Sequence, residues 1–237
     1  MAKFVVISLG GSLIVPHLSD DGGVDVAFLR KFRAFIVGEI KKGKRFIIVA
    51  GGGKTTRVYQ KAATLISKAS SDDLDWVGIA STKLNAHVLL SMFRAAAYPH
   101  IIDHEPSARE IEKLTNADKS LYIASGWVPG QSTDHVAVRL AQKFGARDVV
   151  NASNIPFVYD KDPKKHKDAK PIRGISWREY RKLIPQKWTP GLSTPIDPVA
   201  ARLAEKTGLQ VKIIKGSDLK NFKRAIDDKP FQGTTVT

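Results

Sequence analysis

The sequence predicts an α/β protein, a three-layer αβα sandwich with a mainly parallel central sheet. Two observations lead to this fold class: apolar runs of strand length alternate with segments of helical periodicity, and glycine-rich turns follow several of the apolar runs. Strands that alternate with helices favour a parallel sheet covered on both faces, because each crossover helix packs back onto the sheet. The chain has 237 residues, 43% of them hydrophobic, which is enough for one large domain or two small ones.

The first expected strand is Phe4–Leu9, an apolar run that ends in two glycines. Val24–Lys41 is expected to be a helix, because Phe28, Phe32 and Ile36 repeat at helical spacing and a glycine follows. The other elements are assigned in the same way. The further expected strands are Arg45–Val49, Tyr98–Ile102, Leu121–Ala124, Asp148–Ala152 and Val211–Ile214, and the further expected helices are one after the triple glycine, Leu74 to Ala97, Thr133–Phe144, Pro195–Thr207 and Asp218–Asp227.

The chain is strongly basic, with a net charge of +15 and a pI of about 9.9. Such a balance favours anionic partners such as nucleotides. Ten basic and three acidic residues lie between Lys161 and Lys187, and this run is either a solvated face or a rim that attracts phosphate. Helix-turn-helix, zinc-finger and RNP-type patterns are absent from the sequence, so we expect no nucleic-acid partner.

Several classes of site are excluded by composition. The sequence has no cysteine, so disulfides and cysteine metal sites are excluded, and its six histidines are scattered, so no residue is assigned to a metal. The longest apolar runs have strand length, which predicts no membrane span and no membrane partner. The first residues, MAKFVVISLGGS, are typical of a buried strand rather than a signal peptide, and the expected location is cytoplasmic.

The most informative stretch is AGGGKTTR, residues 50–57. It ends like a phosphate-binding P-loop, but that motif requires a glycine where Ile48 stands. Three glycines between a strand and a helix still let backbone N–H groups approach an anion closely. Further glycine turns, at Gly10-Gly11 and from Gly126 to Gly130, also follow strands, and the carboxyl ends of parallel strands share one sheet edge. A ligand with several phosphates is expected there. A dinucleotide fold is not, because no G-x-G-x-x-G follows the first strand.

The order of these segments resembles the amino acid kinase family, and within it the uridylate (UMP) kinases of the archaeal type. The resemblance covers nearly the whole chain and rests on ISLGGSLIVP, AGGGKTTR, DWVGIASTKLNA, SGWVPGQSTD, NASNIPFVYDKDP, STPIDPVAARLAEKTG and the closing GTTVT. Each motif is weak by itself, but together they follow the order and spacing of the family. The resemblance implies a single amino acid kinase-like domain over residues 1–237, with an acceptor-binding part over roughly 1–150 and an ATP-binding part over roughly 151–237.

By this resemblance the protein is expected to be an ATP-dependent kinase that transfers the γ-phosphate to UMP, giving UDP for pyrimidine nucleotide biosynthesis. Mg²⁺ is expected to bind with ATP, and such sites act by positioning and charge neutralisation rather than covalent chemistry. Arg57 and Asp134 are the expected catalytic residues, Arg57 because a guanidinium stabilises charge on a transferring phosphoryl group. Asp134 would orient its neighbours. The expected partners are ATP, UMP and other copies of the chain, since UMP kinases of this family are typically hexamers.

The remaining site residues follow from the same motifs. Asp75 would accept hydrogen bonds from the ribose hydroxyls of UMP, because a carboxylate is an acceptor-only group. The loop from Trp127 to Thr133 would enclose the base and the phosphate of UMP. The resemblance assigns ATP to Gly11, Ser12, Gly53, Arg57, Ser153, Asn154, Tyr159 and Asp162, and UMP to Gly52, Asp75, Trp127, Val128, Pro129, Gly130, Gln131, Ser132 and Thr133.

Two departures from the family pattern keep other functions open. Many members carry a lysine two residues before the first glycine pair, where this chain has Ser8, so no catalytic lysine is assigned. The family's Asp-Gly in the ATP segment is replaced by Pro156-Phe157, which removes an N–H and a permissive glycine. The alternatives are another small-molecule kinase of the same superfamily, or a nucleotide-binding sensor or storage protein that does not catalyse.

Overall fold

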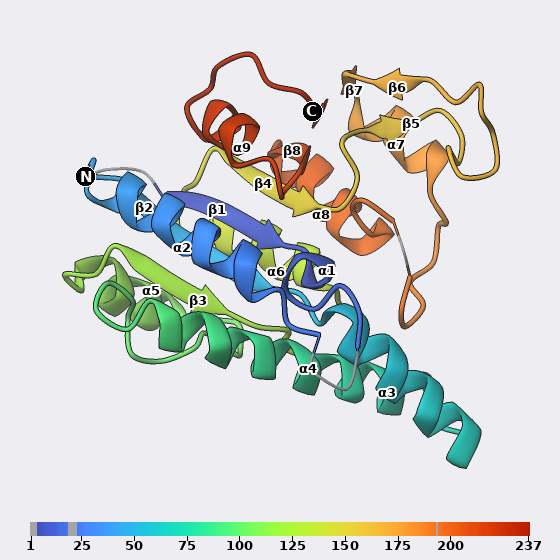
Figure 1. Ribbon diagram of the computed structural model, residues 1–237, viewed down its shortest axis with the longest axis horizontal. Helices are drawn as coiled ribbons and strands as arrows, with labels where there is room; N and C mark the ends of the chain where they lie inside the picture. Colours follow the sequence, from blue (N-terminus) through green and yellow to red (C-terminus); the bar gives the residue numbers. More distant parts are fainter. Residues whose placement is uncertain (1–3, 19–22, 193) are drawn as a thin grey trace.

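The computed structural model describes residues 4–18, 23–192 and 194–237. Its centre is a seven-stranded sheet with strand order β3-β2-β1-β4-β8-β9-β7 (Figure 1). The first five strands in this order run parallel to one another, which confirms the mainly parallel sheet of the sequence prediction. Their bounds are Leu121–Ala124 (β3), Arg45–Ala50 (β2), Phe4–Leu9 (β1), Asp148–Ser153 (β4) and Gln210–Lys215 (β8).

The last two strands of the sheet come from the end of the chain and from its middle. β9 (Thr234–Val236) runs antiparallel to β8, and β7 (Gly174–Ile175) pairs in parallel with β9. β7 therefore reaches the sheet only through β9, because no other strand neighbours it in the sheet order of the described residues. A separate two-stranded sheet joins β5 (Val158–Tyr159) and β6 (Pro171–Ile172).

Two apolar cores lie on opposite faces of the sheet, because successive strand residues point to opposite sides. On β1, Val6 belongs to one core and Ile7 to the other, and Ile47 and Ile48 divide in the same way on β2. These four side chains have no exposed surface. A strand buried on both faces reads as a continuous apolar run, which is the pattern that made β1 and β2 recognisable in the sequence.

Helices cover both faces, so the three-layer αβα sandwich is confirmed (Figure 1). The turns after β1 and β2 each lead into a helix at the same edge of the sheet. The candidate site lies at this edge. One core includes side chains of α2 (Val26–Ile40), α4 (Ser71–Met92) and α9 (Leu219–Ile226). The other core includes side chains of α5 (Ala108–Asn116), α6 (Thr133–Lys143), α7 (Trp177–Leu183) and α8 (Pro198–Thr207). The helix α1 (Gly11–Ile14) follows β1, and α3 (Gly53–Ile66) follows β2.

Capping boxes begin three of the helices. Ser70 starts α4, and its hydroxyl and backbone N–H exchange hydrogen bonds with Asp73. The same reciprocal arrangement begins α5 at Ser107 and α7 at Ser176, with a glutamate three residues later in each case. The sequence analysis assigned neither α5 nor α7, although both boxes are visible in the sequence.

The expected strand Tyr98–Ile102 is wrong. Only its ends contact β3: Tyr98 N–H donates to Leu121 O at 2.8 Å, and Ile102 N–H donates to Ile123 O at 2.9 Å. The pairing is limited to isolated bridges at Ala97 and Ile102, and no ladder joins the residues between them. Pro99 has no N–H to offer to a neighbouring strand, which interrupts the pairing that the apolar residues suggested.

No helix in the described ranges is long and apolar enough to cross a membrane. The apolar side chains of α4, the longest helix with 22 residues, are instead divided between a buried stripe and an exposed one.

Candidate active site

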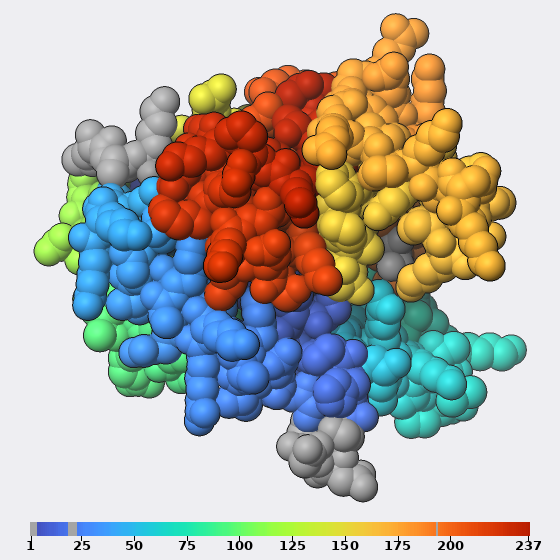
Figure 2. All heavy atoms as spheres, turned by 45° about the horizontal axis from the view of Figure 1, so that its top comes forward, coloured from blue at the N-terminus to red at the C-terminus, as the bar shows by residue number. Residues whose placement is uncertain are grey.

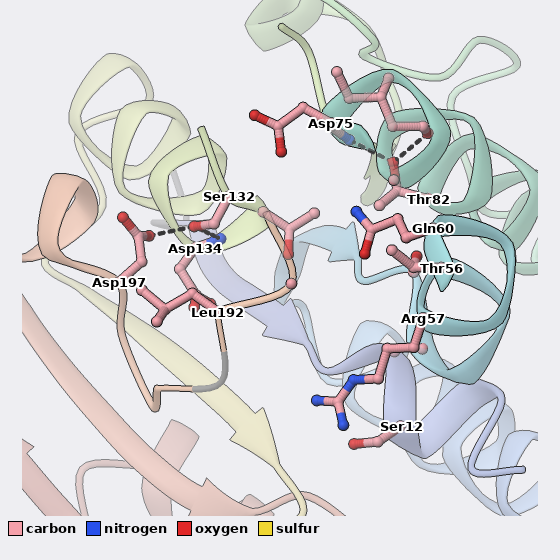
Figure 3. Close-up of a pocket in the computed structure, with 18 of the residues that line it drawn as sticks. Ser12, Thr56, Arg57, Gln60, Asp75, Thr82, Ser132, Asp134, Leu192 and Asp197 are labelled. Atoms are coloured by element: carbon pink, nitrogen blue, oxygen red, sulfur yellow. Dashed lines mark hydrogen bonds between the residues drawn. The ribbon is translucent and has the colours of Figure 1, made fainter. Parts of the chain in front are cut away.

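A cavity of about 280 Å³ opens at the carboxyl ends of β1 and β2 (Figure 3). Its walls come from the turn after β1, the first turns of α3, the first half of α4, the loop before α6 and the segment between α7 and α8. In Figure 2 the segments after residue 153, in yellow and orange, face α3, in cyan, on one side of the molecule. Ten of the predicted site residues line the cavity: Gly11, Ser12, Gly52, Gly53, Arg57, Asp75, Gln131, Ser132, Thr133 and Asp134.

The two glycine turns at the cavity contact each other backbone to backbone. A Cβ atom on Gly11 would overlap the backbone nitrogen of Gly53 and would lie 2.6 Å from the carbonyl carbon of Gly51. Gly53 has a φ of +71°, in the left-handed region, and a Cβ there would overlap the carbonyl oxygen of Gly11. The turns can approach only because neither carries a side chain, and this leaves their backbone groups as the surface of the cavity.

Asp134 is held at the deep end of the cavity by hydrogen bonds from two strands. Ser8 Oγ on β1 and Asn151 Nδ2 on β4 both donate to Asp134 Oδ1, each at 2.7 Å. Burial raises the pKa of Asp134 to about 7, and the charge of Asp197 adds to this, while the two donated hydrogen bonds lower the pKa in part. Near neutral pH this carboxyl group is therefore close to half ionised, so a nearby cation can change its charge.

Asp197 and Ser132 join the N-termini of two helices. Asp197 caps α8, since its Oδ1 accepts from Val199 N–H at 2.7 Å and Ala200 N–H at 3.1 Å. Ser132 Oγ caps α6 by accepting from the N–H groups of Asp134 and His135, and it donates to Asp197 Oδ2. Both helices thus begin at the cavity, where the positive ends of their dipoles favour an anionic ligand.

Asp75 lies on the opposite wall, in the second turn of α4, and is 7% exposed. Its Oδ2 accepts a hydrogen bond from Gly130 N–H at 2.7 Å and another from Trp188 Nε1–H at 3.1 Å. Figure 3 shows the carboxylate of Asp75 directed into the cavity. The loop before α6 and the segment after α7 therefore meet at this one carboxylate.

Two cations stand at the cavity in the first turns of α3. Lys54 and Arg57 both line it, and both side chains are exposed. Neither side chain makes an ion pair or a hydrogen bond with any residue in the described ranges, so both charges are available to a ligand. Figure 3 shows the guanidinium group of Arg57 on the same side of the cavity as Ser12.

Several predicted site residues lie outside the cavity. Trp127 is 5% exposed, and its indole N–H donates to Ile102 O at 3.2 Å, so this side chain belongs to the core. Val128 is exposed, and Pro129 does not line the cavity. Gly130 does not line the cavity, but its N–H donates to Asp75, which does.

The predicted ATP residues of the second half form a separate group beyond the end of β4. They are Ser153, Asn154, Tyr159 and Asp162, and none of them lines the cavity. Ser153 Oγ accepts from Ile155 N–H at 3.2 Å, and exposed Asp162 accepts from Lys164 N–H at 2.9 Å. The structure thus brings the phosphate-side and acceptor-side residues together and leaves this group on an open surface.

Sequence reasoning assigned no role to several residues of the cavity wall. Asp197 carried a recognisable signal, because Asp followed by Pro198 is a typical helix start. Some of the others, such as Lys54 and Gly126, lie within motifs that the sequence showed but received no role, whereas Trp188 and its neighbours reach the cavity through long-range packing. The unassigned lining residues are Pro16, Lys54, Thr56, Gln60, Gly78, Ile79, Thr82, Gly126, Trp188, Gly191, Leu192, Thr194 and Asp197.

Residues 3–215 match the model of the amino acid kinase family. The chain belongs to the amino acid kinase family. The glycine turns after β1 and β2, and the helix that begins at Thr133, are therefore parts of an amino acid kinase fold. The cavity between them is the candidate active site of that fold.

Relatives of this amino acid kinase include uridylate kinases of archaea. The chain is 36% identical over 225 residues to a uridylate kinase of Hyperthermus butylicus, covering 94% of this chain and 93% of that protein. It is 32% identical to a uridylate kinase of Pyrococcus abyssi, covering 98% of both chains. The crystal structure of uridylate kinase from Archaeoglobus fulgidus superposes with a TM-score of 0.79 at 29% identity, covering 99% of this chain and 100% of that one.

Proposed function

We propose that this chain is an ATP-dependent uridylate kinase, which converts ATP and UMP to ADP and UDP. The observation that carries the proposal is the cavity itself. Asp75, the proposed acceptor residue, lines the same cavity as Gly11, Gly53 and Arg57, the proposed phosphate-binding set. The uridylate kinases of Hyperthermus butylicus and Pyrococcus abyssi, which match this chain over nearly its whole length, support UMP as the acceptor.

Phosphoryl transfer needs positioning and charge stabilisation from the protein rather than a covalent intermediate. The backbone groups of Gly11 and Gly53 would bind the ATP phosphates at close range, where a side chain would block the approach. Arg57 would stabilise the charge that develops on the transferring group, because its guanidinium is exposed to the cavity without a protein partner in the described ranges. Asp134 would hold Ser8 and Asn151 in place behind that group.

A kinase that acts on ATP needs a divalent cation, and we propose Mg²⁺. No cluster of three or more His, Cys, Asp or Glu that could hold a metal occurs among the described residues. Mg²⁺ at such sites is usually bound by substrate phosphates and one or two carboxylates, so this donor set fits a cation that arrives with ATP. Asp134 is the carboxylate best placed to face it, and the cation would neutralise phosphate charge.

The acceptor residues of the proposal are Asp75 for the ribose and the loop from Gly130 to Thr133 for the phosphate and base. Gln131, Ser132 and Thr133 line the cavity. The hydroxyl of Ser132 is engaged in capping α6 and in contacting Asp197, so its part would be to place the helix start rather than to bind UMP directly. Gly52 also lines the cavity and completes the proposed acceptor set.

ATP would be held by Ser153, Asn154, Tyr159 and Asp162. Ser12 would contact its phosphates. Phe157 packs edge-on against Tyr159, with ring centroids 6.5 Å apart, and Arg173 lies over the Phe157 ring at 5.8 Å. Phe157 and Tyr159 therefore form an aromatic pair next to Pro156, where the family pattern has Asp-Gly. A nucleotide base can lie against such a surface without an amide contact from Pro156.

The alternative of a nucleotide-binding sensor or storage protein rests on Ser8. Its hydroxyl donates to Asp134, so it does not reach into the cavity as a lysine would. Lys54 is available at the cavity instead, which favours catalysis over binding without turnover. Another small-molecule kinase is disfavoured because Asp75 provides a hydrogen-bond acceptor suited to a diol.

We further propose that the chain forms a homo-oligomer, with the hexamer kept as a prediction from the family. α3 has no buried residue, and Tyr59, Leu65 and Ile66 are exposed by 61%, 77% and 84%. An apolar surface of this kind favours contact with another copy of the chain. A cytoplasmic location and the division into acceptor-binding and ATP-binding parts also stay predictions.

The test is a coupled ADP-release assay with Mg²⁺ and ATP across four acceptors: UMP, CMP, isopentenyl phosphate and acetylglutamate. Turnover of UMP well above that of the other three is expected. Activity with isopentenyl phosphate but not with UMP would replace the proposal by the related kinase. Binding of nucleotide without turnover of any acceptor would favour the sensor or storage protein.

A further inference from the structure

Residues 188–192, here called the strap, cross from the segment after α7 to the wall of the cavity formed by α3 and α4. Trp188 reaches Asp75 on α4 with its indole N–H. Gly191 lies against Gln60 on α3: a Cβ on this glycine would stand 3.3 Å from Gln60 Oε1. Gln60 Nε2 in turn donates to Leu74 O at 2.8 Å, which joins α3 to the start of α4.

The strap has a defined local shape. Leu192 N–H donates to Thr189 O at 3.1 Å, which closes a turn, and Gly191 within that turn has a φ of +73°. Pro190 fixes its own φ in the same turn. The strap therefore presents Trp188 from a turn rather than from an extended loop, and the indole is partly buried.

The hydrogen bonds at Asp75 are unequal between its two oxygens. Oδ2 accepts both Gly130 N–H and Trp188 Nε1–H, whereas Oδ1 accepts none from any residue of the described ranges. Oδ1 is not among the fully buried polar atoms that lack a hydrogen-bond partner in these ranges. It is therefore accessible from the cavity. A carboxylate oxygen has two lone pairs, enough to accept both hydroxyls of a ribose.

We propose that Trp188 is a positioning residue for the acceptor nucleotide, because its indole N–H fixes the orientation of the Asp75 carboxylate. The inference rests on the proposed function, in which Asp75 binds the ribose of UMP. The last torsion of an aspartate side chain is broad and roughly two-fold, so a single donor leaves it free to turn. Two donors that arrive on Oδ2 from separate segments hold Oδ1 toward the ligand.

The proposal separates the indole N–H from the bulk of the ring. Trp188→Phe removes the donor and keeps an aromatic ring in the strap. We expect KM for UMP to rise about fivefold to tenfold, the order expected for losing a hydrogen bond to a charged group in part. We expect kcat to stay within about twofold, because Trp188 does not touch the transferred phosphate.

The measurement is steady-state kinetics with two acceptors, UMP and 2′,3′-dideoxy-UMP, which lacks both ribose hydroxyls. If Trp188 acts through Asp75 and those hydroxyls, its substitution raises KM for UMP and leaves KM for the dideoxy acceptor unchanged. Trp76→Phe is the matched control, since Trp76 neighbours Asp75 in sequence, is 52% exposed and does not line the cavity. It should change neither KM. In an Asp75→Ala background, where no side-chain acceptor remains for the indole, Trp188→Phe should add nothing.

Three results would overturn the proposal. An equal rise in KM for both acceptors would mean that the ring covers the base instead of orienting Asp75. An unchanged KM for UMP would make the contact incidental. A lower KM would mean that Trp188 competes with the ribose for Asp75. If the unaltered chain does not phosphorylate UMP, the proposed function fails. The affinities of the same variants for UMP, measured by calorimetry, then decide the inference about Trp188. If UMP does not bind at all, that inference is overturned as well.

Discussion

The two proposed nucleotide-binding regions are constructed in different ways. At the ends of β1 and β2 the backbone itself forms the surface, and Gly11 and Gly53 contact each other too closely for any Cβ atom. Beyond the end of β4, residues 153–170 form an exposed segment whose only strand is the two-residue β5. Its order comes from turn hydrogen bonds such as Asp160 N–H to Lys170 O, from the pairing of β5 with β6, and from side-chain contacts such as the edge-on pair of Phe157 and Tyr159.

The difference separates two kinds of binding. A backbone surface without side chains has one shape, which suits the invariant phosphate groups of a nucleotide. A segment held by turns and a two-residue ladder fixes fewer of its residues, which accounts for Pro156-Phe157 in place of the expected Asp-Gly. Each prediction below alters one region and uses the other, or a neighbouring position, as its reference.

The largest effect is expected for Gly11→Ala. The new Cβ overlaps the backbone of Gly53, and backbone cannot move aside as a side chain can. We expect a loss of about 3 kcal/mol of stability, which corresponds to about 6–12 °C in Tm for a chain of this size, with no measurable kinase activity. Gly174→Ala is the matched control, because a Cβ there meets nothing within 4 Å. Equal Tm values for the two variants, measured by thermal unfolding, would contradict the contrast.

Arg57→Ala should lower kcat by about a hundredfold to a thousandfold, the range found when one preorganised charge donor is removed. The exposed guanidinium has no protein partner in the described ranges, so the Tm should not change. Lys61→Ala, one turn further along α3 and outside the cavity, should keep normal turnover. Near-normal kcat in the Arg57 variant would reduce this residue to part of the surface.

Asp134→Asn should change how stability depends on pH. The folded pKa of about 7 lies above the reference value of 3.8, so the unfolded chain ionises first as pH rises. The contribution of Asp134 to the stability of the unaltered protein therefore falls between about pH 4 and pH 7 and stays constant above that. We take the Tm of the variant minus the Tm of the unaltered chain, both measured without nucleotide or metal. This difference should become several degrees more positive between about pH 4.5 and about pH 8.

Asp162→Asn is the control for that profile, since Asp162 is an exposed carboxylate of the other region. A similar pH-dependent gain in the Asp162 variant would show that the profile follows net charge rather than the buried site. A pH-independent difference for Asp134→Asn would show that this carboxyl group titrates at the same pH in the folded and unfolded chain.

The smallest effect concerns the affinity of ATP for the exposed segment. The basic run from Lys161 to Lys187 should attract the triphosphate, and salt screens such attraction between exposed charges. We expect the Kd of a non-hydrolysable ATP analogue to rise about fivefold between about 0.05 M and about 0.5 M salt by calorimetry. Lys164→Glu should weaken binding at low salt, whereas Lys31→Glu on α2 should not. Tight, salt-insensitive binding would show that local contacts suffice and that the basic run is irrelevant.

The sequence was most informative where one local pattern determined the structure. β1 and β2 are apolar on both faces, and their glycine turns had to share an edge once the sheet was parallel, so Gly11 and Gly53 were predicted close together. Asp75 was predicted only from the family resemblance, and all three residues line one cavity. The strand at Tyr98–Ile102 failed because Pro99 outweighed its apolar neighbours. The helices α5 and α7 were missed although their capping boxes were present.

Contacts between distant segments could not be read from the sequence. Trp188 and Asp75 are 113 positions apart, and nothing near either residue indicates the other. Ser132 and Asp197 read separately as helix starts, but their contact depends on how α6 and α8 pack. The raised pKa of Asp134 likewise needs the burial and the neighbouring Asp197 that only the folded chain supplies.

The position of β9 has a consequence for the order in which the protein is assembled during synthesis. β7, at Gly174–Ile175, joins the sheet only through β9, at Thr234–Val236. At translation speeds of about 5–20 residues per second, the partner strand emerges about 3–12 s after β7 does. For that interval the nascent chain holds β7 and the β5–β6 ribbon without their anchor to the sheet. A ribosome that pauses late in the message would prolong the time in which the proposed ATP-binding part is incompletely assembled, although the glycine turns after β1 and β2 were translated long before.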